Sequence, residues 1–151
     1  GTGILACALM CFYLPQILLG NREEKPSIQN NIFIGAFTAI KAKLRNLHLA
    51  PSQLLQEYAS FGAPDPEIET QLAFDTERHH YQLLNVGWRN DRRIYGCFLH
   101  LDIKDGKIWL QHNGTENEVT EDLVNMGVPK QDIVIGFHSP FKRQFTEYAV
   151  G

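Results

Sequence analysis

The sequence has 151 residues and a formal net charge of −3, with 44% hydrophobic and 21% charged residues. This length suits one domain with a substantial core, and the composition is that of an ordinary globular protein. The acidic balance argues against a general nucleic-acid binder, which normally carries a basic surface. The cysteines Cys7, Cys11 and Cys97 form no C-x-x-C pair, so a reducing, cytoplasmic location is expected rather than a disulfide framework.

Residues 1–49 open with an apolar run, residues 4–19, and continue with a polar linker candidate, residues 21–31. Pro15 interrupts the run, which is also shorter than the roughly 20 apolar residues of a membrane-spanning helix. Three interpretations of this part of the chain stay open: a membrane anchor, a structured extension, and an artefact of the gene model. We favour the artefact.

Two elements are predicted between this segment and the middle of the chain. Pro51 is expected to restart the chain, and Ser52 is expected to cap a helix that runs through Tyr58. The proline-rich segment at residues 61–66 ends that helix. Residues 68–75 follow, and their alternation of apolar and polar side chains predicts a strand.

Residues 81–114 are predicted to form three antiparallel strands. Asn90-Asp91 and Asp105-Gly106 each separate two apolar runs, which is typical of two-residue hairpin loops. A loop at Asp105-Gly106 sets Leu101 opposite Leu110 and Asp102 opposite Trp109. Because side chains alternate along a strand, the expected core face carries Tyr95, Cys97, Leu99, Leu101, Ile103, Ile108 and Leu110. The opposite face is expected to carry Leu83, Phe98, His100, Asp102 and Trp109.

The last third of the chain adds helices and one strand. The apolar stripe at Val119, Leu123 and Met126 predicts a short helix that Gly127 ends. Residues 129–135 predict a helical turn leading into a strand, and the closing aromatic residues at 141, 145 and 148 have helical spacing. The predicted fold class is α+β, an antiparallel β-meander of about four strands flanked by helices.

No common catalytic motif occurs in the sequence: it has no phosphate-binding glycine loop, no H-E-x-x-H and no G-x-S-x-G. His100 and Asp102 share a strand face, a spacing found in metal and acid–base sites. His112 is expected on the other face, however, and the vicinal pair His79-His80 cannot direct both rings to one side. We interpret these residues as hydrogen-bonded sheet residues.

Asp65, Asp102 and Lys104 form a loose nuclease pattern, since two-metal cleavage requires carboxylates and often a lysine. At least one strand is expected to separate Asp65 from Asp102, so chance is the better explanation. The sequence therefore predicts no catalytic residue, no cofactor and no metal ligand.

Two surfaces are candidates for contacts with other molecules. The outer sheet face is more apolar than a solvated face should be, which makes Trp88, Phe98 and Trp109 a candidate interface. The candidate DNA contact consists of Arg89, Arg92 and Arg93 around one hairpin tip.

Four segments resemble the XisI family of fdxN-element excision controlling factors, known from cyanobacteria. They are LLQEYA, ERHHYQLLNVGW, RRIYGCFLHLDIKDGKIWLQHNGTE and LVNMGVPKQDIVIGFHSPFKRQFTEYAV, in this order. The resemblance covers about residues 50–151, the expected XisI-like domain, and leaves residues 1–49 outside. At the first hairpin tip the family pattern has Asn-Gly where this chain has Asn90-Asp91.

The resemblance implies a small accessory protein that takes part in DNA rearrangement. Such a protein acts with a companion called XisH and a site-specific recombinase, and controls excision of a DNA element during heterocyst differentiation. The family has no assigned catalytic residues, so the leading hypothesis is a non-enzymatic regulatory protein that binds the companion or a second copy of itself. The alternatives are a metal-dependent nuclease and a direct DNA-binding module.

Overall fold

The computed structural model describes residues 28–151, and their side chains from residue 34 onward. The apolar run at residues 4–19 lies outside the described residues, as does most of the linker candidate at residues 21–31. Residues 37–151 pack together as one unit. Among the described residues, no helix combines the length and the hydropathy needed to span a bilayer.

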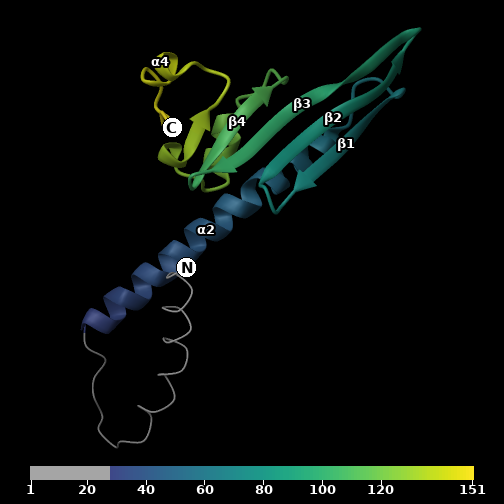
Figure 1. Cartoon of the computed structure of the whole chain (residues 1–151). Coiled ribbons are helices and arrows are strands. Elements are labelled where there is room, and N and C mark those ends of the chain that lie inside the picture. The colour runs from purple at the N-terminus through teal and green to yellow at the C-terminus, as the bar shows by residue number, and fades with distance from the viewer. Residues whose placement is uncertain (1–27) are drawn as a thin grey trace, which may run out of the picture. The chain divides into compact units, whose positions relative to one another are not determined.

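Five strands form one open sheet in the order β1-β2-β3-β4-β5 (Figure 1). Neighbouring strands run antiparallel from β1 to β4, and β5 pairs in parallel with β4. This arrangement confirms the α+β class with its antiparallel meander, and adds a short fifth strand. The strands are β1 (Ile68–Asp75), β2 (His80–Arg89), β3 (Arg92–Lys104), β4 (Lys107–Asn113) and β5 (Ile133–Ile135).

One long helix supplies most of the cover for the inner face of the sheet. The expected restart at Pro51 is wrong, because α2 (Ile28–Phe61) passes through Pro51 without a break. Ser52 therefore does not cap a new helix; its hydroxyl donates to the Leu49 carbonyl oxygen at 2.9 Å. Leu47 before the proline and Leu54 after it are both buried in the same core. The free energy gained by this burial offsets the cost of the backbone hydrogen bond that proline cannot donate.

The smaller elements after the meander agree with the sequence, apart from the last helix. The predicted helix is α3 (Val119–Asn125), and the following Gly127 has a φ of 91°. The predicted helical turn is η1 (Lys130–Asp132), which leads directly into β5. Only α4 (Pro140–Arg143) is shorter than the aromatic spacing indicated.

The second hairpin has the expected loop and register. Asp105 and Gly106 have φ values of 52° and 71°, the positive values that a type I′ turn requires at both central positions. Leu101 pairs with Leu110 across the hairpin, and Asp102 pairs with Trp109. The register predicted from this turn is therefore confirmed.

A bulge in β3 at Phe98 overturns part of the expected face assignment. Leu84 pairs with Cys97, whereas the neighbouring Leu83 pairs with Leu99, so Phe98 is an extra residue in β3. A bulge reverses the alternation of side chains on one side of it. Cys97 and Tyr95 consequently leave the core face, where they were expected.

The same bulge moves two residues from the outer face to the core. Phe98 was expected on the outer face, but its side chain is partly buried and packs against the core. Leu83, also expected on the outer face, is 2% exposed and lies directly opposite the buried Leu99. Both corrections follow from the register shift, since Leu83 now shares a face with Tyr81 and Leu101.

The core lies between the inner sheet face and the helices α2 and α3. Leu54 and Leu55 of α2 and Leu123 of α3 are at most 1% exposed, and they join the inner side chains of β2, β3 and β4 in one cluster. All three residues of β5 are buried as well. The C-terminal segment pairs with β5 through a parallel bridge between Val134 and Ala149, so β5 has a pairing partner along both of its edges.

Candidate functional site

The outer face is the sheet face that points away from α2, and three kinds of candidate residue lie on it or at its ends. Trp88 is 54% exposed and pairs with Arg93 across the β2–β3 hairpin. The Arg93 guanidinium lies 5.4 Å from the centre of the Trp88 ring and 6.0 Å from that of Tyr95. Tyr95 is 73% exposed. Trp88, Arg93 and Tyr95 form a patch that we call the hairpin patch.

Trp109, the second tryptophan of the candidate interface, is largely covered by the chain itself. The guanidinium of Arg143 lies 4.9 Å from its ring centre, and the Lys104 ammonium lies 5.1 Å from it. Its Nε1 atom is buried and has no hydrogen-bond partner among the described residues. Trp109 therefore packs against Arg143 of the C-terminal segment. Of the three candidate interface residues, Trp88 is the exposed one.

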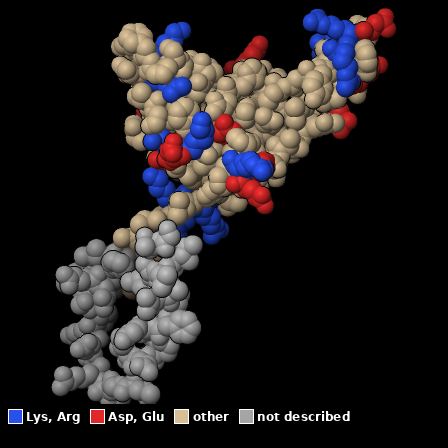
Figure 2. All heavy atoms as spheres, viewed as in Figure 1, with Lys and Arg blue, Asp and Glu red and all other residues tan. Residues whose placement is uncertain are grey.

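The three arginines of the candidate DNA contact lie at the far end of the β2–β3 hairpin. Figure 2 shows the basic side chains gathered there beside acidic ones. Arg89 Nε donates to Asp65 Oδ2 at 3.0 Å, and Arg93 Nη1 donates to the Gly87 carbonyl oxygen at 3.0 Å. Arg92 is exposed at the tip. The carboxylate of Asp65 thus offsets part of the positive charge that a phosphate would meet.

The nuclease pattern is not assembled in the fold. Asp65 is bonded to Arg89 at the end of β2, whereas Asp102 pairs with His80 at its start. The 10 residues of β2 separate the two carboxylates by roughly 30 Å. Two-metal cleavage places its ions about 4 Å apart, so these carboxylates cannot share such a centre.

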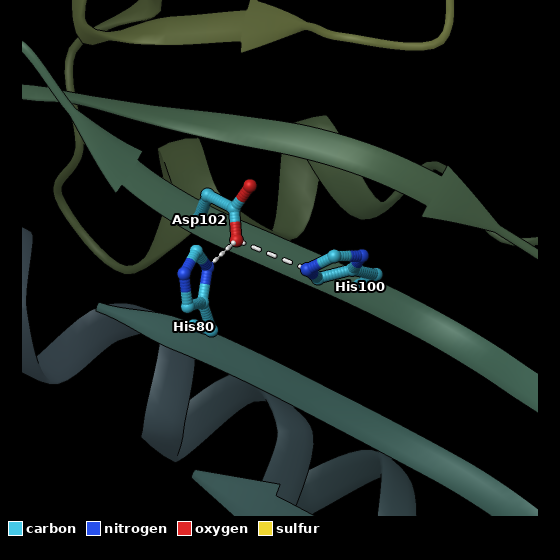
Figure 3. A group of neighbouring side chains, drawn as sticks. All are labelled: His80, His100 and Asp102. Carbon is cyan, nitrogen blue, oxygen red and sulfur yellow. Dashed lines mark hydrogen bonds and ion pairs between the residues drawn. The ribbon is translucent and has the colours of Figure 1, made fainter. Parts of the chain in front are cut away.

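Asp102 does converge with two histidines on the outer face, as Figure 3 shows. Asp102 Oδ1 lies 2.7 Å from His80 Nδ1 and 3.0 Å from His100 Nε2. Asp102 is buried, His100 is half-buried and His80 is exposed. We call these three residues the His–Asp cluster.

Two glutamines extend the His–Asp cluster. Gln111 Nε2 donates to Asp102 Oδ2 at 2.8 Å, so both carboxylate oxygens of Asp102 are engaged. Gln82 Nε2 lies 3.4 Å from His100 Nε2. Burial raises the pKa of the Asp102 carboxyl, but the hydrogen bonds from His80 and Gln111 and the nearby imidazoles outweigh burial, and the pKa lies below its usual range. Asp102 is therefore a carboxylate at neutral pH.

The other histidines lie outside the His–Asp cluster. A second bulge, at Gln111 in β4, places His112 opposite His100, so the expectation that His112 lies on the other face is wrong. His112 is nevertheless exposed and does not join the three converging residues. His79 has a φ of 62°, and its ring lies 4.8 Å from that of His48. As expected for neighbours in sequence, His79 and His80 point to different surroundings.

His80 is the member of the cluster that the sequence did not single out. Asp102 and His100 were recognised as sharing a face, but the partner considered for them was His112. The missing signal was the pairing of His80 with Asp102, which depends on the bulge at Phe98. His80 has this partner on the next strand, although its neighbour His79 faces different surroundings.

Comparison with known proteins gives one consistent result. The family model described as XisI protein matches residues 42–150. A XisI-like protein from Anabaena variabilis, of known crystal structure, is 52% identical with a TM-score of 0.68; the match covers 72% of this chain and 99% of that chain. The fdxN element excision controlling factor XisI from the same organism is 30% identical with a TM-score of 0.64 and the same coverage. None of the curated proteins matches this chain.

These matches agree with the resemblance carried by the four sequence segments. The matched region contains all five strands, α3, η1, α4 and the part of α2 that packs on the sheet. It also contains the His–Asp cluster and the hairpin patch. Sequence and fold together therefore show that this chain belongs to the XisI family.

Proposed function

We propose that this protein is a non-enzymatic accessory factor that controls the site-specific excision of a DNA element. The observation that carries the proposal is its 30% identity to the fdxN element excision controlling factor XisI, over 99% of that chain. In this role a recombinase cuts and joins the DNA, and the accessory factor decides whether excision occurs. The roughly 30 Å between Asp65 and Asp102 supports a division of labour in which another protein does the cutting.

The factor acts through contact with a XisH-like companion protein, in the cytoplasm. The hairpin patch is the surface proposed for this contact, since Trp, Tyr and Arg are the residue types that most often dominate protein interfaces. Trp88 and Tyr95 are 54% and 73% exposed, and Arg93 stacks beside both rings. An exposed aromatic pair with a preorganised guanidinium provides contact area at a low cost in side-chain entropy.

Affinity purification from the native cell tests the partner. The full chain, carrying a tag, is expected to recover a XisH-like protein. Trp88→Ala is expected to lower the affinity for that protein at least about thirtyfold and so to reduce its recovery, since an interface tryptophan typically contributes about 2 kcal/mol or more. Phe145→Ala is the matched control, because Phe145 is 76% exposed but lies in the C-terminal segment. Equal loss in both variants, or none in either, would show that the contact lies elsewhere.

A second measurement tests control of excision. Deleting the gene is expected to change the fraction of chromosomes that carry the excised junction, measured by quantitative amplification across it. Asp102→Asn is expected to leave DNA cleavage by the complete system intact, because no cutting is assigned to this chain. Metal-dependent cleavage of DNA by the purified protein, abolished by Asp102→Asn, would make it a nuclease and refute the accessory role.

A further inference from the structure

The His–Asp cluster brings three good metal-binding groups to one point on the outer face. One ring nitrogen of His80, one ring nitrogen of His100 and one carboxylate oxygen of Asp102 all lie within 4.8 Å of one another. The three residues lie on two adjacent strands, β2 and β3. Because His80 pairs directly with Asp102, the two side chains lie side by side on the outer face. We propose that His80, His100 and Asp102 bind a divalent transition-metal ion of the Zn²⁺ class.

The distances suit an ion of this size. Zn²⁺ binds imidazole nitrogen and carboxylate oxygen at about 2.0–2.2 Å, so neighbouring ligands on a tetrahedral ion lie about 3.3 Å apart. Asp102 Oδ1 is 2.7 Å from one imidazole nitrogen and 3.0 Å from the other. An ion bound by all three requires Asp102 Oδ1 to move a few tenths of an ångström from each imidazole nitrogen, and requires the two imidazole nitrogens, which lie within 4.8 Å of each other, to move closer together. The side chain of His80 is 49% exposed and has room for this adjustment.

The residues around Asp102 hold its carboxylate in a fixed orientation, as a metal ligand requires. The side chain of Asp102 is 8% exposed, and Gln111 donates to the oxygen that the histidines leave free. Outer partners of this kind orient a ligating carboxylate and keep its rotamer fixed. Because strand residues rather than a loop carry all three ligands, the cluster is preorganised.

The remaining coordination positions face a shallow cleft. The cleft has a volume of about 540 Å³, and His80, Gln82 and His100 line it together with Ala73, Phe74 and Asp75 of β1. Three protein ligands with an open side are the arrangement found where a metal keeps exchangeable positions, in contrast to the closed four-ligand sites of purely structural zinc. Water fills such positions in a resting site.

The ligand set also selects the class of metal. Imidazole nitrogen suits Zn²⁺, Fe²⁺, Co²⁺, Ni²⁺ and Cu²⁺, whereas Mg²⁺ and Ca²⁺ prefer sites made of oxygen ligands. Two imidazoles and a single carboxylate therefore favour the transition metals. We expect saturable binding of Zn²⁺ and Co²⁺ and none of Mg²⁺ under the same conditions.

Titration calorimetry of the full chain, first stripped of metal with a chelator, tests the proposal. Zn²⁺ is expected to bind one ion per chain, and His80→Ala and Asp102→Asn are each expected to weaken binding by about 100-fold. Gln111→Ala is expected to weaken it by about tenfold, the effect typical of an outer partner. Co²⁺ provides a second readout, because visible absorption bands report its coordination by imidazole and carboxylate directly.

His112→Ala is the matched control. His112 is an exposed imidazole that pairs with His100 on the same sheet face but lies outside the three converging residues. Its loss is expected to leave Zn²⁺ affinity unchanged, and circular dichroism verifies the fold of every variant. The proposal is overturned if the wild-type chain shows no saturable Zn²⁺ binding, or if binding survives His80→Ala and Asp102→Asn undiminished. Either result leaves the proposed control of excision untouched, since metal binding is measured on the purified chain alone.

Discussion

At the scale of single residues, Arg143 shows how one side chain organises the end of the chain. Its guanidinium donates to backbone carbonyl oxygens at 2.9–3.2 Å, and these belong to Ile135, Gly136, His138 and Val150. Its planar group also lies 4.9 Å from the Trp109 ring centre. A planar, five-donor group can serve several acceptors at once, and a lysine ammonium cannot reproduce that geometry. Arg143 therefore ties the C-terminal segment to β5 and to the outer face.

Arg143→Ala is expected to lower the free energy of unfolding by about 2–3 kcal/mol, because several carbonyls lose a charged donor together. Arg143→Lys is expected to recover only part of this loss. The measurement is urea denaturation, supported by hydrogen exchange of residues 133–150. Lys142→Ala, at an exposed neighbouring cation, should change stability by less than about 0.5 kcal/mol. A similar loss in both variants would show that charge, not the hydrogen-bond geometry, matters here.

At the scale of elements, features encoded by neighbouring residues were predictable. The Asp105-Gly106 turn fixed the β3–β4 register near the loop, because positive φ at both central positions permits only a tight hairpin. The bulge at Phe98 was not predictable in the same way. It depends on the partner strand and on Gly114, whose N–H donates to the Phe98 carbonyl oxygen at 2.8 Å. The continuity of α2 through Pro51 was not predictable from the local sequence either, because a proline disfavours the interior of a helix. The helix continues because residues on both sides of Pro51 are buried in the core.

The bulge at Phe98 also explains why the His–Asp cluster escaped prediction. At the hairpin loop Arg89 pairs with Arg92, and continuing that register without interruption sets His80 opposite Leu101, a core residue. The extra residue in β3 shifts the pairing by one, and His80 then lies opposite Asp102. A one-residue slip exchanges the two faces of a strand. Finding the site from sequence therefore required locating the bulge first.

The close approach of β1 to β2 gives a test at this scale. A methyl group added at Gly87 would lie 2.2 Å from the Glu67 carbonyl oxygen and 2.8 Å from the Ile68 Cα atom. Both are backbone atoms, so the strand itself would have to move. Gly87→Ala is therefore expected to cost about 2–3 kcal/mol of stability, the upper part of the range of about 1–3 kcal/mol that is typical of overpacking.

Gly96 on β3 is the matched control for Gly87. A methyl group added there meets no atom within 4 Å, and the backbone conformation does not require glycine. Gly96→Ala is expected to be neutral or slightly stabilising, because alanine loses less backbone entropy on folding. Thermal unfolding of both variants decides the matter. If the two variants are equally stable, the backbone at Glu67 and Ile68 moves away from residue 87 without a measurable loss of stability.

At the scale of the whole molecule, the question is where the folding unit begins. The sequence places the boundary between residues 49 and 50, but α2 runs through that point and the family match begins at residue 42. Leu47 is 4% exposed within the core, and Lys43 Nζ lies 2.9 Å from Oδ2 of the buried Asp132. In contrast, Phe37 and Ile40 are 55% and 57% exposed. Lys43 and Leu47, both before residue 50, therefore contribute contacts between α2 and the rest of the fold.

Two truncated chains test this boundary. Residues 42–151 are expected to unfold in one cooperative transition, because they keep Leu47 and the Lys43–Asp132 ion pair. Residues 50–151 are expected to be less stable by about 3 kcal/mol, within the range for loss of a buried leucine, and to leave Asp132 without its partner. Within the longer fragment, Leu47→Ala should reproduce most of this loss, whereas Leu44→Ala, at a side chain that is 51% exposed, should not. Urea denaturation compares all four proteins under the same conditions. If residues 50–151 prove as stable as residues 42–151, the stretch of α2 before Ala50 adds nothing to the core, and the boundary drawn from the sequence is the right one.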